Sequence, residues 1–295
     1  MTKDRFLHIC GNVIVYGFLV ALFLVTFLPF WQVIVLSLND GTDSLRGGVL
    51  LWPRKPTLDS YAAVARDTAI LRSVKVTLLR TVIGVPASVL CMAMVAYPLS
   101  KRDLLARRPL NLFFVFTLYF SGGLVPQYMI IKSVGLIDRF GVFIFPSLVV
   151  VFWMILLRTY MQELPGELEE SARMDGANEI QIFLRIILPM STPVIATVTL
   201  FAAIYHWDAW YDSYVFTYKP ELRTLQAYLV RILNQFQTRE MLTQASVAEE
   251  ARRAAATSQS IRMTVTVFAS IPIVLVYPFL QRYLLKGMMV GAIKG

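Results

Sequence analysis

Long apolar blocks, separated by shorter polar segments, divide this sequence. Six of these blocks contain no charged residue, and each reaches the ~18 residues that mark a candidate membrane-spanning helix. An even number of spans places both chain termini on the same side of the membrane. The pattern therefore predicts an all-α integral membrane protein with six transmembrane helices. The six runs are Val13–Leu38, Thr81–Ser100, Pro109–Ile131, Phe140–Leu157, Ile186–Tyr205 and Met263–Gln281.

The polar segment Glu163–Pro189 has the pattern of two short helices joined by a tight turn. Pro165 suits the first position of a helix, and the acidic residues after it suit the positive end of the helix dipole. Gly176 can adopt the left-handed conformation that ends such a helix. Asn178 is a suitable N-cap for the second helix, with Gln181 as its capping-box partner. We expect the second helix to end at the proline that closes the segment.

The same segment resembles the EAA loop of ATP-binding-cassette (ABC) importer permeases. Glu170-Ser171-Ala172 matches the E-A-A of that family, and the following glycine and the I-x-L-P end, Ile186 to Pro189, have its spacing. Ser171 at the second position of the motif, in place of alanine, is the one departure, and Asp175-Gly176-Ala177 is typical of the carbohydrate-uptake branch. The alternative is a purely structural interfacial hairpin. The resemblance implies a type I importer permease fold in which this hairpin docks in an ATP-binding subunit. The expected docking residues are Glu167, Glu170, Ser171, Ala172, Arg173, Met174, Asp175, Gly176 and Ala177.

Composition and charge agree with a membrane protein. The chain is 57% hydrophobic and 16% charged, and its net charge of +9 suits anchoring against anionic lipid. Nucleic acid is a poor alternative, because no basic stripe with interleaved aromatics is present. The short loop Lys101–Arg108 has four basic residues in eight, which predicts that this loop and the N-terminus are cytoplasmic. Cys10 and Cys91 have no metal-ligand partners nearby, so neither a metal site nor a disulfide framework is indicated.

Arg80 is the unusual residue of the second span. We expect this span to begin near Ser73, which places Arg80 roughly 10 Å inside the membrane at ~1.5 Å per residue. An arginine at that depth usually faces protein or a water-filled cavity. It is either a cavity residue that meets an anionic substrate or a residue that snorkels or pairs with another helix.

Other polar and aromatic residues within the spans are candidates for a sugar path. Ser121-Gly122-Gly123 loosens the backbone of the third span, which suits either a cavity or close helix packing. That motif and Gly135–Asp138 also resemble the polysaccharide-uptake permeases. Aromatic residues alternate with acids in Tyr205–Asp212, which suits either interface anchoring or stacking on sugar rings. The predicted substrate path consists of Arg80, Tyr119, Gln127, Trp153, Tyr205, Trp207 and Asp208.

The loops and tails complete the predicted organisation. Residues 39–72 are rich in turn residues, with one short amphipathic helix near Leu58–Ala65. An alanine-rich charged helix is expected at 245–256, and the resemblance implies that its loop touches an external binding protein. The expected parts are residues 1–72 (tail, first span and outer loop), 73–283 (permease core with the coupling loop 163–189 and the outer loop 206–262) and 284–295 (cytoplasmic tail).

Several motifs are absent from the sequence. It contains no G-x-x-x-x-G-K-[ST], so we expect any ATP and its magnesium to bind to another polypeptide. No nucleophile or metal set of a membrane enzyme is present. All 19 acidic residues lie outside the six runs, which argues against a secondary transporter with intramembrane ion-coupling carboxylates. A secondary transporter or channel that works without ATP nevertheless stays the alternative.

The resemblance thus implies a permease subunit of an ABC oligosaccharide importer of the maltose type, with no cofactor or enzyme site of its own. The implied partners are two ATP-binding subunits, a sister permease in a heterodimer, an extracytoplasmic sugar-binding protein and membrane lipid. The implied location is the bacterial inner membrane. Arg80 and the likeness to acidic-polysaccharide systems, the alginate importer among them, favour uronate oligosaccharides as substrate.

Overall fold

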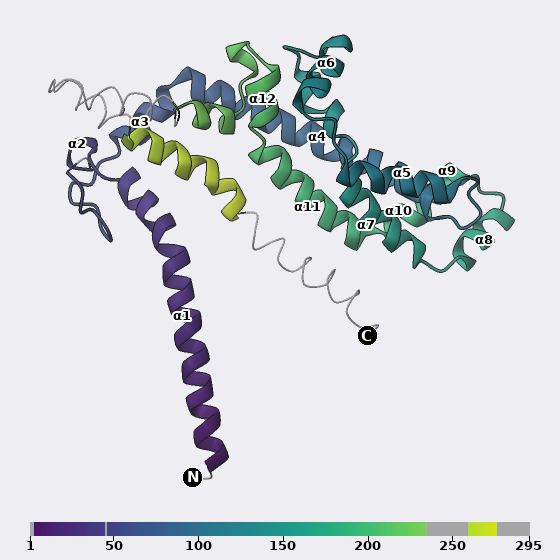
Figure 1. Cartoon of the computed structure of the whole chain (residues 1–295), viewed down its shortest axis with the longest axis horizontal. Coiled ribbons are helices and arrows are strands. Elements are labelled where there is room, and N and C mark those ends of the chain that lie inside the picture. Colours follow the sequence, from purple (N-terminus) through teal and green to yellow (C-terminus); the bar gives the residue numbers. More distant parts are fainter. Residues whose placement is uncertain (1–2, 45, 233, 235–258, 276–295) are drawn as a thin grey trace. The chain divides into compact units, whose positions relative to one another are not determined.

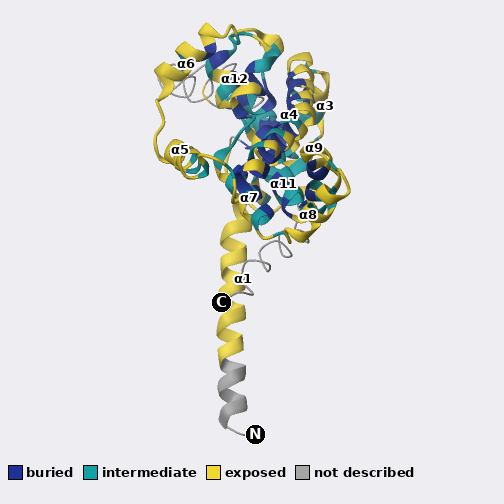
Figure 2. Ribbon diagram, turned by 90° about the vertical axis from the view of Figure 1, so that its right-hand side faces the viewer, coloured by how far each residue is buried: buried dark blue, intermediate teal, exposed yellow. Residues whose placement is uncertain are grey.

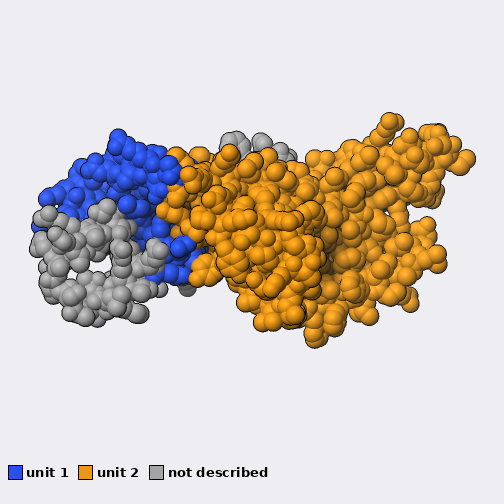
Figure 3. All heavy atoms as spheres, turned by 90° about the horizontal axis from the view of Figure 1, so that it is seen from above, with its two compact units in different colours: residues 1–68, 229–271 blue, residues 69–228, 272–295 orange. Residues whose placement is uncertain are grey.

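The computed structural model describes residues 3–44, 46–232, 234 and 259–275, with side chains from residue 11 onward. Most of these residues are helical, and the only β-type contact among them is an isolated antiparallel bridge between Asn39 and Pro56. Two compact units are present, residues 1–68 with 229–271 and residues 69–228 with 272–295 (Figure 3). The predicted helix at 245–256 and the predicted tail at 284–295 lie outside the described residues.

The first unit is dominated by α1 (Lys3–Ser37), a helix of 35 residues. Its apolar side chains are exposed around most of the helix from residue 11 to about residue 30 (Figure 2). A helix that is apolar all round suits hydrocarbon and not water. The predicted first span is therefore a single long helix.

The outer segment after α1 is held together by polar contacts. It contains α2 (Gly41–Ser44) and α3 (Asp59–Arg66), the latter within a residue of the predicted amphipathic helix. Asn39 accepts a hydrogen bond from the backbone of Lys55 at 2.8 Å, and Thr57 N–H donates to Leu38 C=O at 2.8 Å. These contacts close the segment into a compact loop.

The second unit is built on α4 (Thr68–Ser100), a helix of 33 residues (Figure 1). The helix begins five residues before Ser73, near which we predicted the start of the second span. At ~1.5 Å per residue, α4 is about 50 Å long and exceeds a hydrocarbon core of about 30 Å.

The third predicted span is two helices and not one. α5 (Arg107–Tyr119) and α6 (Leu124–Ser133) meet at 116°. Gly123 has a φ of +82°, and a Cβ there would have no neighbour within 4 Å. This glycine is therefore required by the backbone turn, and close helix packing, the alternative considered above, does not explain it.

The fourth and fifth predicted spans are also bent. Two short 3₁₀ segments, η1 (Phe140–Phe143) and η2 (Phe145–Ser147), lead into α7 (Val151–Gln162) at 45°. The coupling segment meets α11 (Thr192–Asp208) at 81°. The described residues thus contain two uninterrupted helices that can span a membrane, or five spans if each bent pair counts as one. A further apolar helix covers Gln259–Leu275.

The core of the second unit lies where α4, α7, α11 and the coupling segment meet. Small residues allow close approach here: Ala93, Ala96 and Ala202 are completely buried. Met92, Leu157 and Val198 fill the space between them. Since lipid tails are as apolar as leucine, such helices associate through packing and not through the hydrophobic effect. This core joins the coupling segment firmly to the spans.

Candidate functional site

The first arm of the predicted coupling hairpin is α8 (Glu167–Met174). Gly176 follows it with a φ of +82°, as predicted. Its N–H donates to Arg173 C=O at 3.0 Å, and Ala177 N–H donates to Ala172 C=O at 2.9 Å. These two bonds form a complete Schellman motif, with the two alanines packed against the core. The sequence therefore encodes the end of this arm locally.

The second arm begins with the predicted capping box. Asn178 accepts from Gln181 N–H at 2.9 Å, and the Gln181 side chain accepts from Asn178 N–H at 3.0 Å. The arm does not stop at Pro189 as predicted. It runs through α9 (Glu179–Ile182), a π-helical turn at Phe183–Ile187 and α10 (Leu188–Met190) before the chain bends into α11. Proline is tolerated there because it occupies the first turn of α10, where its missing N–H is not needed.

The inner face of the hairpin is bonded to the end of α4. Lys101 forms an ion pair with Glu169, and its ammonium lies 4.4 Å from the centre of the Tyr97 ring. Tyr97 donates a hydrogen bond to Glu179 at 3.0 Å, and Glu179 pairs with Arg173 at 2.8 Å. Tyr97 and Lys101 were absent from the predicted site, since no sequence spacing relates them to residues about 80 positions later in the chain.

The outer face of the hairpin is free of such contacts in the described chain. Glu167, Glu170, Ser171, Asp175 and Gly176 are exposed, and the Met174 side chain is 88% exposed. Ala172 and Ala177 face the core instead, and Arg173 is committed to Glu179. The outer face of the hairpin thus carries carboxylates around the apolar side chain of Met174, and this face suits insertion into a groove of another protein.

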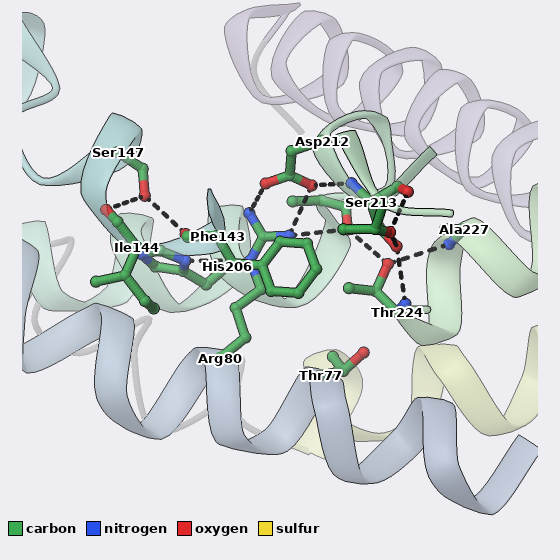
Figure 4. Close-up of polar contacts among 12 residues, drawn as sticks. Thr77, Arg80, Phe143, Ile144, Ser147, His206, Asp212, Ser213, Thr224 and Ala227 are labelled. Carbon is green, nitrogen blue, oxygen red and sulfur yellow. Dashed lines mark hydrogen bonds and ion pairs between the residues drawn. The ribbon is translucent and has the colours of Figure 1, made fainter. Parts of the chain in front are cut away.

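Arg80 is enclosed by the surrounding helices and does not belong to the lining of the cleft described below. Its side chain is completely buried and forms a bidentate ion pair with Asp212, with one Nη1–Oδ1 distance of 2.8 Å (Figure 4). Its Nε lies 3.4 Å from Nδ1 of His206, and the guanidinium lies 5.1 Å from the centre of the Phe143 ring. Arg80 therefore has an interhelical partner, which was the other reading of this residue.

His206 packs against α4 through a matching glycine. A Cβ placed on Gly84 would lie 2.6–2.9 Å from three atoms of the imidazole ring, closer than any real contact. The glycine thus leaves room for the ring beside the Arg80 side chain. The two helices meet closely at this point because Gly84 has no side chain and the His206 ring occupies that space.

The element that Arg80 holds is α12 (Tyr211–Phe216), and it is fastened at both ends. At its far end, the Asp138 carboxylate accepts from the N–H groups of Tyr218 and Lys219 at 2.6 and 3.0 Å. These two bonds lower the pKa of Asp138, with the Lys219 N–H the larger cause. The Gly135–Asp138 motif therefore has a structural explanation: Gly135 caps α6 at a φ of +73°, and Asp138 clamps the segment after α12.

A cleft of about 350 Å³ opens between α12, the end of α11 and the segment around η2. Three of the predicted path residues, Gln127, Tyr205 and Asp208, line this cleft. Asp208 accepts a hydrogen bond from Gln226 at 3.2 Å. Aromatic rings and amide or carboxylate oxygens in one wall suit stacking on sugar rings and bonding to hydroxyl groups. The other lining residues are Val142, Pro146, Ser147, Ile204, Ala209, Trp210, Tyr211, Asp212 and Phe216.

The remaining predicted path residues lie elsewhere. Trp153 packs behind the cleft, with its ring centre 5.7 Å from that of Tyr205. Trp207 is buried, and Tyr119 is exposed at the end of α5, and neither lines the cleft. Trp210 and Tyr211 were left out of the predicted set, although they belong to the aromatic run that suggested it.

Comparisons with protein families and with curated proteins both found components of membrane transport systems. The family model described as "Binding-protein-dependent transport system inner membrane component" matches residues 60–290. The chain is 35% identical over 284 residues to "Polygalacturonan/rhamnogalacturonan transport system permease protein YtcP" of Bacillus subtilis (strain 168), covering 96% of this chain and 98% of the relative. It is 25% identical to "Arabinooligosaccharides transport system permease protein AraQ" of Halalkalibacterium halodurans, covering 95% of each.

The comparison with solved structures also found transporters of this kind. A chain in the crystal structure of a bacterial ABC transporter "involved in the import of the acidic polysaccharide alginate" is 28% identical, with a TM-score of 0.82 over 96% of this chain and 98% of that one. A chain in a second structure, a bacterial alginate ABC transporter "in complex with alginate pentasaccharide-bound periplasmic protein", is 16% identical with a TM-score of 0.51 over 89% and 94%. The second likeness concerns the fold alone.

Proposed function

The chain belongs to the family of binding-protein-dependent transport system inner membrane components, and from this premise we propose that it moves acidic oligosaccharides through an ATP-driven importer. It is the membrane permease component of an ABC importer of sugars or oligosaccharides. The observation that supports the coupled mechanism best is the capped hairpin with one face bonded to α4 and the other exposed.

We propose six spans with both termini in the cytoplasm. The three bent pairs and the two long helices provide five spans, and the helix at Gln259–Leu275 provides the sixth. The basic loop 101–108 supports a cytoplasmic position for the end of α4, since positive residues in short loops stay inside. The coupling hairpin packs against that same end, which is where a cytoplasmic ATP-binding subunit could reach it.

In this mechanism, two ATP-binding subunits supply the ATP site with its magnesium, and α8 docks in a groove of one of them. Closure of those subunits around ATP would move the hairpin. The hairpin is bonded to Tyr97 and Lys101 of α4, so α4 would move with it. Because Arg80 of α4 is paired with Asp212, the wall of the substrate cleft at α12 would move as well. A sister permease would complete the path, and a loaded binding protein would favour the ATP-bound state by binding it better.

The substrate class follows from the relatives and the cleft together. The relative named for polygalacturonan and rhamnogalacturonan and the structure of the alginate importer both support uronate-containing oligosaccharides. In the cleft, Asp212 is neutralised by Arg80, and Asp208 accepts from Gln226. We therefore propose that this wall recognises ring faces and hydroxyl groups through Tyr205 and Tyr211, while the sister permease supplies cations for the uronate carboxylates.

The coupling proposal is tested by co-expressing the chain with a sister permease and a tagged ATP-binding subunit. The measured quantity is the ATPase recovered per permease from detergent-solubilised membranes. Glu170→Arg should reduce it about tenfold or more, because like-charge contacts at an interface cost several kcal/mol. Glu221→Arg makes the same charge change on an exposed residue outside the coupling loop and should leave recovery unchanged. A folded, monodisperse wild-type chain that recovers no ATPase would instead support a carrier that works without ATP.

The substrate proposal is tested in proteoliposomes that contain the assembled importer. Uptake of galacturonate oligosaccharides should exceed that of neutral arabino-oligosaccharides. Tyr211→Ala should lower uptake and Tyr211→Phe should largely retain it, since stacking needs the ring. Equal uptake of both sugars would contradict the acidic substrate class without affecting the coupling proposal.

A further inference from the structure

A second cleft, of about 410 Å³, lies between α5 and α7 beside the basic loop and away from the substrate path. Its lining combines three arginines and two side-chain amides with two aliphatic residues. No acidic side chain of the described residues belongs to it. The lining residues are Arg107, Arg108, Asn111, Leu112, Val115, Arg158 and Gln162.

The three arginines lack carboxylate partners in the part of the chain that the structure describes. The ion pairs found there join other residues. Arg107 Nε lies 3.4 Å from Leu99 C=O, and Arg158 Nη1 donates to the Asn111 side chain. Three neighbouring guanidinium groups without a counter-charge repel one another, so the cleft favours an anion.

Two donors in the cleft also lack an acceptor. Arg158 Nε and Gln162 Nε2 are buried, and neither has a hydrogen-bond partner among the residues that the structure describes. Buried polar groups in proteins are nearly always hydrogen-bonded, so an orphaned pair of donors in one cleft indicates a missing acceptor. Guanidinium groups match the oxygens of a phosphate group in a bidentate arrangement.

The apolar side of the cleft indicates which phosphate compound it takes. Leu112 and Val115 continue the lining along α5, and the same helix exposes Phe113 and Phe116. None of the residues of α5 is buried, so its apolar surface is available to lipid tails. A free phosphate ion would leave this surface unused, whereas a phospholipid would cover it with an acyl chain.

We propose that this cleft binds the phosphate group of an anionic phospholipid from the cytoplasmic leaflet, with an acyl chain along α5. The proposal rests on the orientation given above, in which the loop 101–108 is cytoplasmic. Each arginine that contacts the phosphate in the cleft should contribute about 1 kcal/mol, the free energy with which anionic headgroups attract a basic residue, and this is about a fivefold change in affinity.

The test uses the assembled transporter, purified with its sister permease and ATP-binding subunits. The complex is incubated with phosphatidylglycerol, with phosphatidylcholine or with inorganic phosphate, and bound molecules are counted by native mass spectrometry. Arg158→Gln and Arg108→Gln each remove one charge from the cleft lining. Arg108 is exposed, so its replacement should not impair folding even if the replacement of Arg158 does. Arg102→Gln removes the same charge from the same loop outside the cleft and is the matched control.

The expected result is retention of phosphatidylglycerol over phosphatidylcholine, weakened about fivefold by Arg108→Gln or Arg158→Gln and unchanged by Arg102→Gln. Equal retention in the wild-type complex and the three variants would overturn the proposal. So would a wild-type complex that binds inorganic phosphate but shows no preference for phosphatidylglycerol, or one in which partner carboxylates cover the arginines and no lipid binds. Loss of the ATP-binding subunits from the wild-type complex would be a failure of the proposed function instead, and it is seen before any lipid is added.

Discussion

The coupling hairpin and the wall of the substrate cleft are both polar sites attached to α4, but they are built in opposite ways. The hairpin is determined by contacts between residues a few positions apart, such as Asn178 with Gln181. The cleft wall depends on Arg80 and Asp212, which are 132 positions apart. A short-range motif survives small changes in the surrounding helices, whereas a buried long-range ion pair requires all of its elements at once. The two sites should therefore respond differently to mutation.

The largest effect is expected from Asp212→Ala. This change leaves the completely buried Arg80 guanidinium without its counter-charge, and breaking a buried pair in this way costs about 3–5 kcal/mol. The midpoint of thermal unfolding in detergent should fall accordingly. The double variant Arg80→Met with Asp212→Leu should recover most of the loss, because it removes both charges. An equally large loss in the double variant would mean that packing, and not charge, holds α12.

Gly84→Ala should have the next largest effect. The added methyl group would overlap the His206 ring, and such overpacking costs about 1–3 kcal/mol. The same thermal measurement detects it. Gly17→Ala in α1 is the matched control, because a Cβ there meets nothing within 4 Å. If both variants unfold at the same temperature, α4 and α11 are not as closely packed as the structure indicates.

Asn178→Ala tests the local character of the hairpin. Loss of an N-cap costs about 1 kcal/mol, and the cost should remain local to α9. We expect faster hydrogen exchange at the Gln181 amide with little change in the unfolding midpoint. Asn178→Asp should keep slow exchange, since aspartate caps equally well. A large drop in the midpoint would show that the hairpin is as dependent on the whole fold as the cleft wall is.

The smallest effect is a pH dependence at Asp138. Its pKa is lowered by the N–H groups of Lys219 and Tyr218, so its bonds contribute stability above the ordinary carboxyl pKa and lose it as pH falls through the lower folded value. Exchange at the Lys219 amide, corrected for its intrinsic pH dependence, should therefore accelerate below about pH 4. Asp138→Asn should remove this dependence. A wild-type profile identical to that of the variant would contradict the clamp.

Only some of the residues that make long-range contacts could be recognised from the sequence. Arg80 stood out because an arginine about 10 Å inside the membrane usually faces protein or a water-filled cavity, but the sequence could not choose between these alternatives or identify Asp212 as its partner. The aromatic run ending at that residue indicated a site, yet only the fold separates Tyr205, which lines the cleft, from Trp207, which is buried. The two glycines at 122 and 123 indicated a loosened backbone in the third span, but they did not predict a bend of 116° between α5 and α6.

The sequence alone determined the all-helical membrane class, the segments of the chain that are apolar and both caps of the coupling hairpin. These features depend on composition and on residues within one or two turns of each other, where backbone chemistry decides the outcome. Tertiary structure decided that Arg80 is enclosed, that Tyr97 and Lys101 bind the hairpin and that three arginines share one cleft. Such contacts join helices far apart in the chain, and their partners are chosen by how the helices pack. The spacing of residues along the sequence does not show which helices pack together.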